Sequence, residues 1–166
     1  IEFVAEKSII DFTVFKTTAI ASTQILKKVS SNKFLDKQEK MLFEKSLDRF
    51  DKICLLAHEK NVRVLVDAEE SWIQNAIDEI VLSMMMKYNK EKAIVFNTSQ
   101  MYRHDRLNYL KTLHDKALKN NFFVGIKLVR GAYIEKENKR ARRNKDLSPI
   151  CSSKELTDKN FNNKEF

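Results

Sequence analysis

Charged and amide side chains follow the short apolar runs of this sequence, close to where each run ends. In chain order they are Lys16, Asp67, Asn97, Gln100 and Lys127. Lysine neutralises carboxylate and phosphate groups, and the amides of Asn and Gln supply the paired donors and acceptors that bind the edge of a ring. This set indicates a site for an anionic ligand that has a planar, hydrogen-bonding part.

A further cluster, Arg130-Gly131-Ala132-Tyr133, closes the fourth apolar run and adds a guanidinium and a phenol. Gly131 would let the backbone come close to a bulky cofactor, because glycine has no side chain. Neither GxGxxG nor GxxxxGK[ST] occurs, so the sequence has no Rossmann or Walker phosphate loop. Each of these residues alone is more often a solvated strand end or a turn. The repetition at four runs is what favours a site.

These side chains can meet only if the apolar runs are strands of one sheet. Aromatic and β-branched residues predict strands over 12–16, 62–66, 93–96 and 122–129. Apolar residues at helical spacing predict helices over 23–29, 36–60, 71–88 and 103–120, a polar helix from about 135, and the start of another over 152–166. Strands that alternate with helices form a parallel sheet covered by helices, which predicts an α/β fold.

A sheet of this kind either stays open or closes into a (βα)8 barrel, and both place their active groups at the C-terminal ends of the strands. The pattern alone leaves the two alternatives open. A closed barrel takes about 250 residues, whereas about four strands are present in these 166 residues. If the fold is a TIM-type barrel, we expect residues 1–166 to be a single incomplete barrel domain, cut at both ends.

Composition and cysteine spacing exclude several classes of protein. No run approaches the roughly 18 apolar residues of a transmembrane helix. Cys54 and Cys151 form no disulfide pattern, so we expect a reducing compartment and a buried free thiol at Cys54. We expect no metal site, because the histidines are isolated from one another and from the cysteines: His58, His104 and His114.

The net charge of +8 supports a second hypothesis. The cations are spread over the chain except in the run KENKRARRNK at 136–145. Such a run is usually a solvated helix face, but it also fits a non-enzymatic module that binds nucleic acid or an anionic membrane. Salt-sensitive binding of polyanions would favour this alternative.

Four longer motifs at the same strand ends resemble the proline dehydrogenase family. They are VFKTTAIA (14–21), VLVDAEESWIQ (64–74), KYNKEKAIVFNTSQMYRHDRL (87–107) and VGIKLVRGAYIEKE (124–137). The motifs occur in the order of the family, and the similarity extends from about residue 12 to residue 166. The resemblance implies a (βα)8 barrel that binds FAD and oxidises L-proline to Δ1-pyrroline-5-carboxylate.

The resemblance also implies catalytic roles. Lys16 matches the lysine that helps to hold the substrate carboxylate, and Asp67 matches the aspartate that orders polar groups beside the substrate. Tyr133 matches the active-site tyrosine of the family. The other charged residues of these motifs are expected to be structural: Glu69, Glu70, Arg103 and Asp105.

Contacts with FAD are implied for the remaining positions. Asn97 and Gln100 match flavin-contacting amides, and Lys127 matches a basic position next to the isoalloxazine, where some members have Arg. The family segment that lies along the flavin matches Val129, Arg130, Gly131 and Ala132. A cation beside the flavin would favour its anionic reduced form.

Two residues depart from the family pattern, Ser99 in place of Tyr and Asn75 within the WIQ segment. The later strands and the C-terminal helix, whose Tyr and paired Arg grip the substrate, have no counterpart here. The fragment itself is therefore expected to be inactive. The resemblance further implies a quinone as electron acceptor, peripheral association with a membrane and no nucleic-acid partner. The expected location is the cytoplasm at the bacterial inner membrane, or alternatively the mitochondrion.

Overall fold

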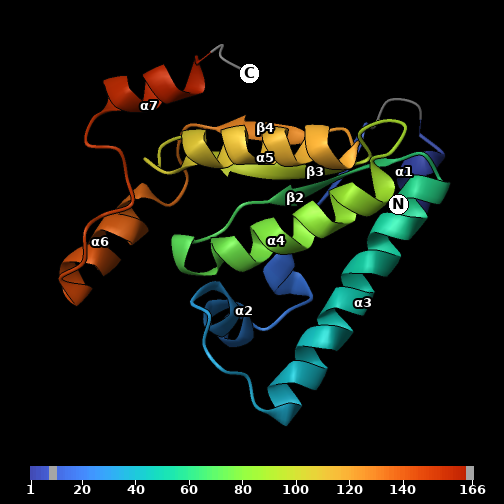
Figure 1. The fold of residues 1–166 in the computed structure, drawn as a ribbon, viewed down its shortest axis with the longest axis horizontal. Coiled ribbons are helices and arrows are strands. Elements are labelled where there is room, and N and C mark those ends of the chain that lie inside the picture. The colour runs from blue at the N-terminus through green and yellow to red at the C-terminus, as the bar shows by residue number, and fades with distance from the viewer. Residues whose placement is uncertain (8–10, 164–166) are drawn as a thin grey trace.

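Short segments rich in Val, Phe and Leu form the strands. They are β1 (Phe12–Lys16), β2 (Arg63–Asp67), β3 (Val95–Gln100) and β4 (Ile126–Val129). In the computed structural model, which describes residues 1–7 and 11–163, they make a parallel four-stranded sheet in the order β1-β2-β3-β4. Each of these strands pairs only with its neighbours in the sequence (Figure 1).

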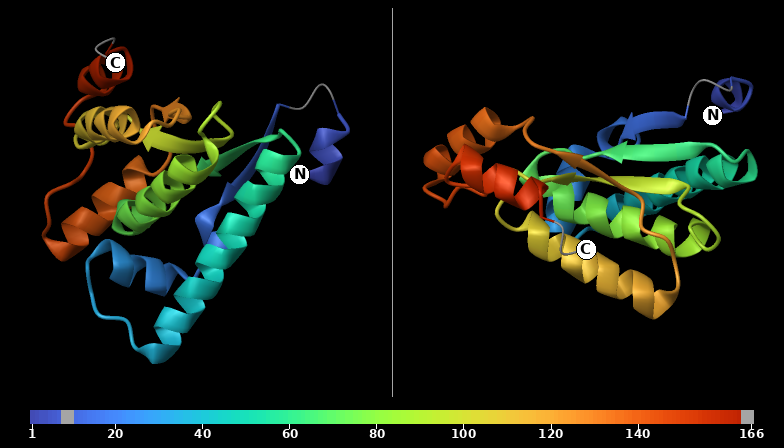
Figure 2. Two further views of the ribbon diagram at one scale, coloured as in Figure 1. Left: turned by 45° about the vertical axis from the view of Figure 1, so that its right-hand side comes forward. Right: turned by 90° about the horizontal axis from the view of Figure 1, so that it is seen from above.

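Helices precede, connect and follow the strands. In chain order they are α1 (Glu2–Ala5), the 3-10 helix η1 (Thr17–Ala19), α2 (Thr23–Ser30), α3 (Lys37–Glu59), α4 (Ser71–Tyr88), α5 (Arg106–Asn120), α6 (Ile134–Asn144) and α7 (Lys154–Phe161). Figure 2 shows α3, α4 and α5 together on one face of the sheet. Helix α6 lies beyond one end of the strands, at the left of Figure 1.

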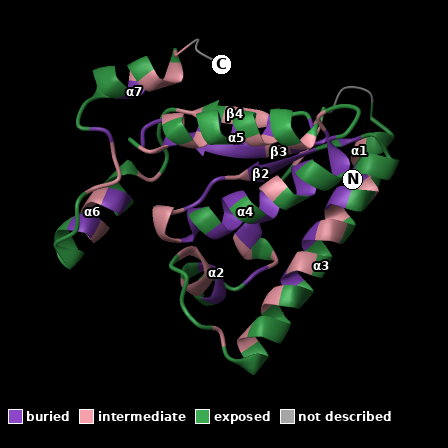
Figure 3. Ribbon diagram, viewed as in Figure 1, coloured by how far each residue is buried: buried purple, intermediate pink, exposed green. Residues whose placement is uncertain are grey.

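The hydrophobic core lies between the sheet and these helices, where Figure 3 shows the buried segments. Its residues come from the strands, such as Val64 and Val95, and from α4, such as Ile73 and Ile77. Cys54 of α3 is fully buried here, and burial raises the pKa of its thiol to about 12. The predicted buried free thiol is therefore confirmed.

The predicted α/β fold with four strands is confirmed, but three strands differ from their predicted bounds, and β2 covers 63–67 instead of 62–66. β3 covers 95–100 instead of 93–96, and β4 begins at residue 126 instead of 122. The buried side chain of Asn89 binds the backbone where β3 and β4 were expected to begin. Its Oδ1 accepts hydrogen bonds from the N–H groups of Ile94 and Val95, and its Nδ2 donates to the carbonyls of Val95 and Phe123. A side chain thus binds backbone groups that strand pairing was expected to use.

Short elements account for the other differences. The sequence analysis did not predict α1 or η1, because four residues or fewer are too short to show a hydrophobic period. The predicted final helix is shorter than expected, since α7 ends at residue 161. Residues 164–166 of that prediction lie outside the described residues.

Gly125 allows β3 and β4 to approach each other. A Cβ at this position would lie 2.5 Å from the carbonyl oxygen of Val95 and 2.8 Å from Cγ of Phe96. The substitution Gly125→Ala should therefore lower the free energy of unfolding by about 1–3 kcal/mol, because the backbone of β3 would have to shift. Urea denaturation measures this change. As a control, Gly131→Ala meets only the side-chain tip of Ile134, at 3.2 Å, and should change stability much less. Equal losses in the two variants would contradict the prediction.

Candidate active site

Alternation along the strands separates their side chains into two faces. Phe15 packs on Phe50 of α3 with ring centroids 5.0 Å apart, so Phe15 faces the helices and Lys16 faces away from them. The parallel register places Asp67 beside Lys16. The ends of β1 and β2 therefore present a cation and a carboxylate side by side on the face opposite the long helices.

An ion pair joins the end of β2 to β4 across β3. The Nζ of Lys127 lies 2.5 Å from Oδ1 of Asp67, and the two side chains keep 38% and 30% of their surface exposed. A half-exposed pair of this kind contributes little to stability. It fixes the ammonium group on the open face, where the N–H groups that Asp67 does not use can donate to a bound molecule.

Lys16 also meets Tyr133, which precedes α6. The Nζ of Lys16 donates to the Tyr133 hydroxyl over 3.4 Å. This hydrogen bond is the largest reason that the pKa of Lys16 lies above its usual value, and the carboxylates of Glu69 and Asp67 add to the effect. Lys16 is therefore cationic at neutral pH, as the binding of a carboxylate requires. The structure brings together all three predicted catalytic residues, Lys16, Asp67 and Tyr133.

Gln100 reaches the same end of the sheet but is only 2% exposed. Its Nε2 donates to the backbone carbonyl of Glu69 over 2.7 Å and to the Tyr102 hydroxyl over 2.9 Å. Arg103 donates to its Oε1 over 3.4 Å. Both amide hydrogens are used within the chain, so Gln100 has only a lone pair on Oε1 to offer a ligand.

The structure corrects the predicted position of Asn97. Because β3 continues to Gln100, Asn97 lies within the strand, and alternation turns its side chain toward the helices. There its Nδ2 donates to Oδ1 of Asp78 and to the Tyr109 hydroxyl, both over 2.9 Å, and the residue has no exposed surface. Asn97 is thus a core residue between the sheet and the helices, and its amide does not lie with the polar groups at the end of the sheet.

The segment 129–132 leaves the end of β4 and leads into α6. The guanidinium of Arg130 turns to α7, where it lies 3.3 Å from Oδ1 of Asp158 and 4.1 Å from the ring centroid of Phe161. The Arg130 side chain therefore faces α7. Only its backbone remains in the segment that was predicted to lie along the flavin.

Gly131 in this segment does not adopt a left-handed backbone conformation. Within the described residues, an added Cβ would approach only the side chain of Ile134. Val129 is half-buried, and Gly131 and Ala132 are exposed. The fold itself does not require glycine here, which is consistent with close approach by a bulky ligand.

The sequence analysis missed Glu137, because a carboxylate inside a basic run resembles part of a solvated face. It is only 2% exposed, and it accepts hydrogen bonds from the N–H of Ser71 at 2.6 Å and from its hydroxyl at 2.7 Å. The adjacent Lys136 pairs with Glu70. These contacts dock α6 on the start of α4, and this keeps Tyr133 beside Lys16.

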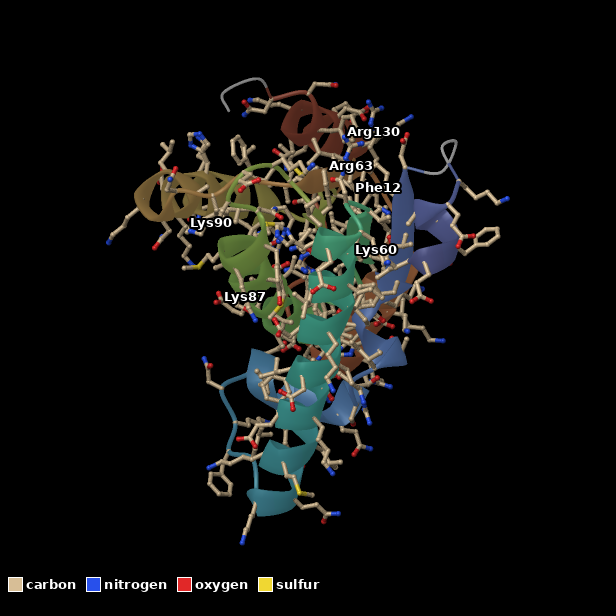
Figure 4. All side chains as sticks on the ribbon, turned by 90° about the vertical axis from the view of Figure 1, so that its right-hand side faces the viewer. Phe12, Lys60, Arg63, Lys87, Lys90 and Arg130 are labelled. Atoms are coloured by element: carbon tan, nitrogen blue, oxygen red, sulfur yellow. The ribbon has the colours of Figure 1, made fainter. Side chains whose placement is uncertain are left out.

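A cavity of about 550 Å³ opens at the opposite end of the strands. Figure 4 labels Phe12, Lys60 and Arg63, which belong to this end, and the guanidinium of Arg63 lies 5.6 Å from the Phe12 ring centroid. In α/β sheets, ligands bind outside the C-terminal ends of the strands. The candidate site therefore stays with Lys16, Asp67 and Lys127.

The described part of the chain covers residues 1–7 and 11–163. They contain no group of three or more His, Cys, Asp or Glu side chains placed to hold a metal ion. None of the helices in this part of the chain combines the length and the apolar character needed to cross a membrane.

Known proteins are similar to this chain over half of its length or more. The family model described as proline dehydrogenase matches residues 3–164. The carbapenem antibiotics biosynthesis protein CarD of Pectobacterium carotovorum subsp. carotovorum is 32% identical over 162 residues, which is 98% of this chain and 42% of that protein. The mitochondrial proline dehydrogenase 1 of Drosophila melanogaster is 44% identical over 105 residues, 63% of this chain and 15% of the relative.

Solved structures resemble the fold. Proline utilization A (PutA) from Bdellovibrio bacteriovorus, inactivated by N-propargylglycine, has a TM-score of 0.75 at 23% identity and covers 89% of this chain. PutA from Corynebacterium freiburgense has a TM-score of 0.76 at 18% identity and covers 96%. The likeness confirms the predicted fold, four βα units of a TIM-type barrel. The chain spans only 14% and 16% of these two proteins, and less than half of CarD and of the Drosophila enzyme.

Proposed function

The chain belongs to the proline dehydrogenase family, and from this membership we propose that the protein containing it oxidises L-proline to Δ1-pyrroline-5-carboxylate with FAD as cofactor. Residues 1–166 would be one incomplete barrel domain of that enzyme. The observation that carries the proposal is the meeting of Lys16, Asp67 and Lys127, from three different strands, on one open face. Enzymes with this fold carry their chemistry at the corresponding end of the sheet.

Lys16 and Tyr133 would bind the substrate. Lys16 supplies a cation for the proline carboxylate, and ionic hydrogen bonds of this kind are among the strongest in proteins. Its contact with Tyr133 is long for a hydrogen bond at 3.4 Å, so Lys16 can turn toward a carboxylate at little cost. Asp67 would act by holding the ammonium of Lys127, which leaves Lys16 free for the substrate.

Lys127 and the segment 129–132 would hold FAD, which accepts a hydride from carbon C5 of proline when bound. The donor set fits this cofactor, because Lys127 offers a cation on the open face and Gly131 leaves space beside the backbone. A fixed cation stabilises the negative charge that the flavin gains on reduction. Gln100 would add a contact through Oε1 only, and Asn97 is not included.

A quinone is the proposed electron acceptor, and the protein would associate peripherally with the membrane that contains it. The proposed location is the cytoplasm at a bacterial inner membrane. The mitochondrion is the alternative, since relatives from Drosophila melanogaster, Dictyostelium discoideum and Homo sapiens are named as mitochondrial. The competing hypothesis of a nucleic-acid or membrane-binding module at 136–145 gains no support, because α6 buries Glu137 and Ala141 against the fold.

L-proline should bleach the flavin absorption of the complete protein that carries this chain. The measurement is a visible spectrum recorded without oxygen before and after L-proline is added, with D-proline as the control. Residues 1–166 alone should show no bleaching, because they supply only part of the proposed substrate site. A folded, colourless complete protein that neither binds FAD nor responds to L-proline would disprove the proposed function.

A further inference from the structure

The loop between β2 and α4 contains a buried carboxylate with no role in the proposed chemistry. Glu69 is 4% exposed, and its two carboxylate oxygens accept hydrogen bonds from a single residue, Thr18. The Thr18 N–H donates to Oε1 over 3.0 Å, and the Thr18 hydroxyl donates to Oε2 over 2.6 Å. No ion pair of Glu69 is found within the described residues, so Thr18 is its main partner.

The backbone of Glu69 is fixed as firmly as its side chain. Its N–H donates to Oε1 of Gln74 over 2.8 Å, and its carbonyl accepts from Nε2 of Gln100 over 2.7 Å. Gln74 belongs to α4 and Gln100 ends β3, and both are buried. Glu69 therefore joins the chain after β1 to a rigid support made by the other elements.

Thr18 follows Lys16 by two residues, at the sharp turn where η1 begins. Lys16 itself is exposed, and its only described hydrogen bond is the 3.4 Å contact with Tyr133. That contact alone is too weak to fix the direction of a long, flexible side chain. The backbone that carries Lys16 is paired with β2, and the turn after it has its own backbone hydrogen bonds; Glu69 adds the side-chain contacts that tie this turn to the loop after β2.

We propose that Glu69 is a positioning residue for Lys16: by clamping Thr18 at the end of β1, it fixes the backbone from which the Lys16 ammonium group reaches the substrate carboxylate. This inference rests on the proposed function for the role of Lys16. It assigns to Glu69 a task in substrate binding, in place of the purely structural role expected from the sequence.

The Glu69→Ala variant of the complete protein should raise the KM for L-proline about tenfold, which corresponds to the loss of buried hydrogen bonds. The kcat per bound flavin should change much less, because the flavin contacts are elsewhere. Glu69→Gln keeps the shape of the clamp, with an oxygen to accept from Thr18 and an amide to donate to its hydroxyl, so its KM should stay near that of the wild type. A Gln variant as impaired as the Ala variant would show that charge, and not geometry, matters.

A double variant separates positioning from general damage to the fold. If Glu69 acts through Lys16, the KM of Lys16→Ala with Glu69→Ala should equal that of Lys16→Ala alone. Additive increases in KM would overturn the proposal. The control is Asp51→Asn, which removes a carboxylate that joins α3 to Lys87 and Tyr88 of α4, away from the site. It should lower stability without changing the KM.

One readout does not depend on catalysis. The 13C NMR signal of dimethylated Lys16, assigned from its loss in Lys16→Arg, should shift in Glu69→Ala but not in Asp51→Asn. An unmoved signal would disprove the positioning role. The two proposals can fail separately. If the wild-type protein does not reduce its flavin with L-proline, but the Lys16 signal still shifts in Glu69→Ala, the proposed function is disproved and the positioning role stands.

Discussion

The Lys127→Ala variant should reduce bound flavin with L-proline about 100-fold more slowly than the wild type, because removal of one preorganised electrostatic group costs roughly two orders of magnitude. Lys127 is the cation that the structure fixes on the open face, where its Nζ lies 2.5 Å from Asp67. Stopped-flow absorbance, recorded without oxygen and normalised to flavin content, measures the rate.

The matched control is Lys127→Arg, which keeps the cation. It should keep most of the rate, and the Arg side chain can still pair with Asp67. The two variants should unfold at similar denaturant concentrations, because the ion pair is half-exposed and contributes little to stability. Equal rates in Lys127→Ala and the wild type would remove Lys127 from the proposed cofactor site.

Asp78→Ala should lower the free energy of unfolding by about 3–5 kcal/mol, the cost of leaving a buried charge without its partner. Nη2 of Arg106 lies 2.8 Å from Oδ2 of Asp78, and the side chains are only 2% and 6% exposed. Oδ1 of Asp78 accepts from Gln74 at 2.8 Å and from Asn97 at 2.9 Å. The substitution would therefore remove the close partner of the Arg106 cation and the acceptor of the Gln74 amide, while the Asn97 amide would keep only the Tyr109 hydroxyl.

The neighbouring residue provides the control for this prediction. Glu79 lies on the same helix and contacts Lys116 at 4.0 Å, with 73% and 44% of the two side chains exposed. Glu79→Ala should change stability by less than about 1 kcal/mol, because water screens an exposed pair. Urea denaturation of both variants tests the difference. Equal and small changes would show that the buried pair is not important for stability.

The sequence predicted the α/β fold, because strand and helix periods are local properties of the chain. It also predicted the meeting of Lys16, Asp67 and Lys127, because parallel strands bring their C-terminal ends to one edge. Asn97 was misplaced for a local reason as well. The strand was expected to end at residue 96, so Asn97 was expected among the polar groups after it, whereas it lies inside β3, where alternation turns its side chain toward the helices.

Tertiary partners could not be predicted in the same way. Arg106 and Glu137 are charged residues in polar segments, yet both are 2% exposed. Their burial depends on Asp78 and Ser71, which are 28 and 66 residues away along the chain. Only the folded arrangement of α4, α5 and α6 brings these groups together, so no pattern within one segment could mark them.

The order of the sheet has a consequence for protein synthesis. The strands β2, β3 and β4 each pair with the strand that precedes them in the chain, so the docking partner has already left the ribosome when each of them emerges. Domains generally fold from the N-terminus during synthesis, at about 5–20 residues per second. A new βα unit can therefore add to an existing edge without waiting for a distant segment. For these four strands, the order of translation is also an order of assembly.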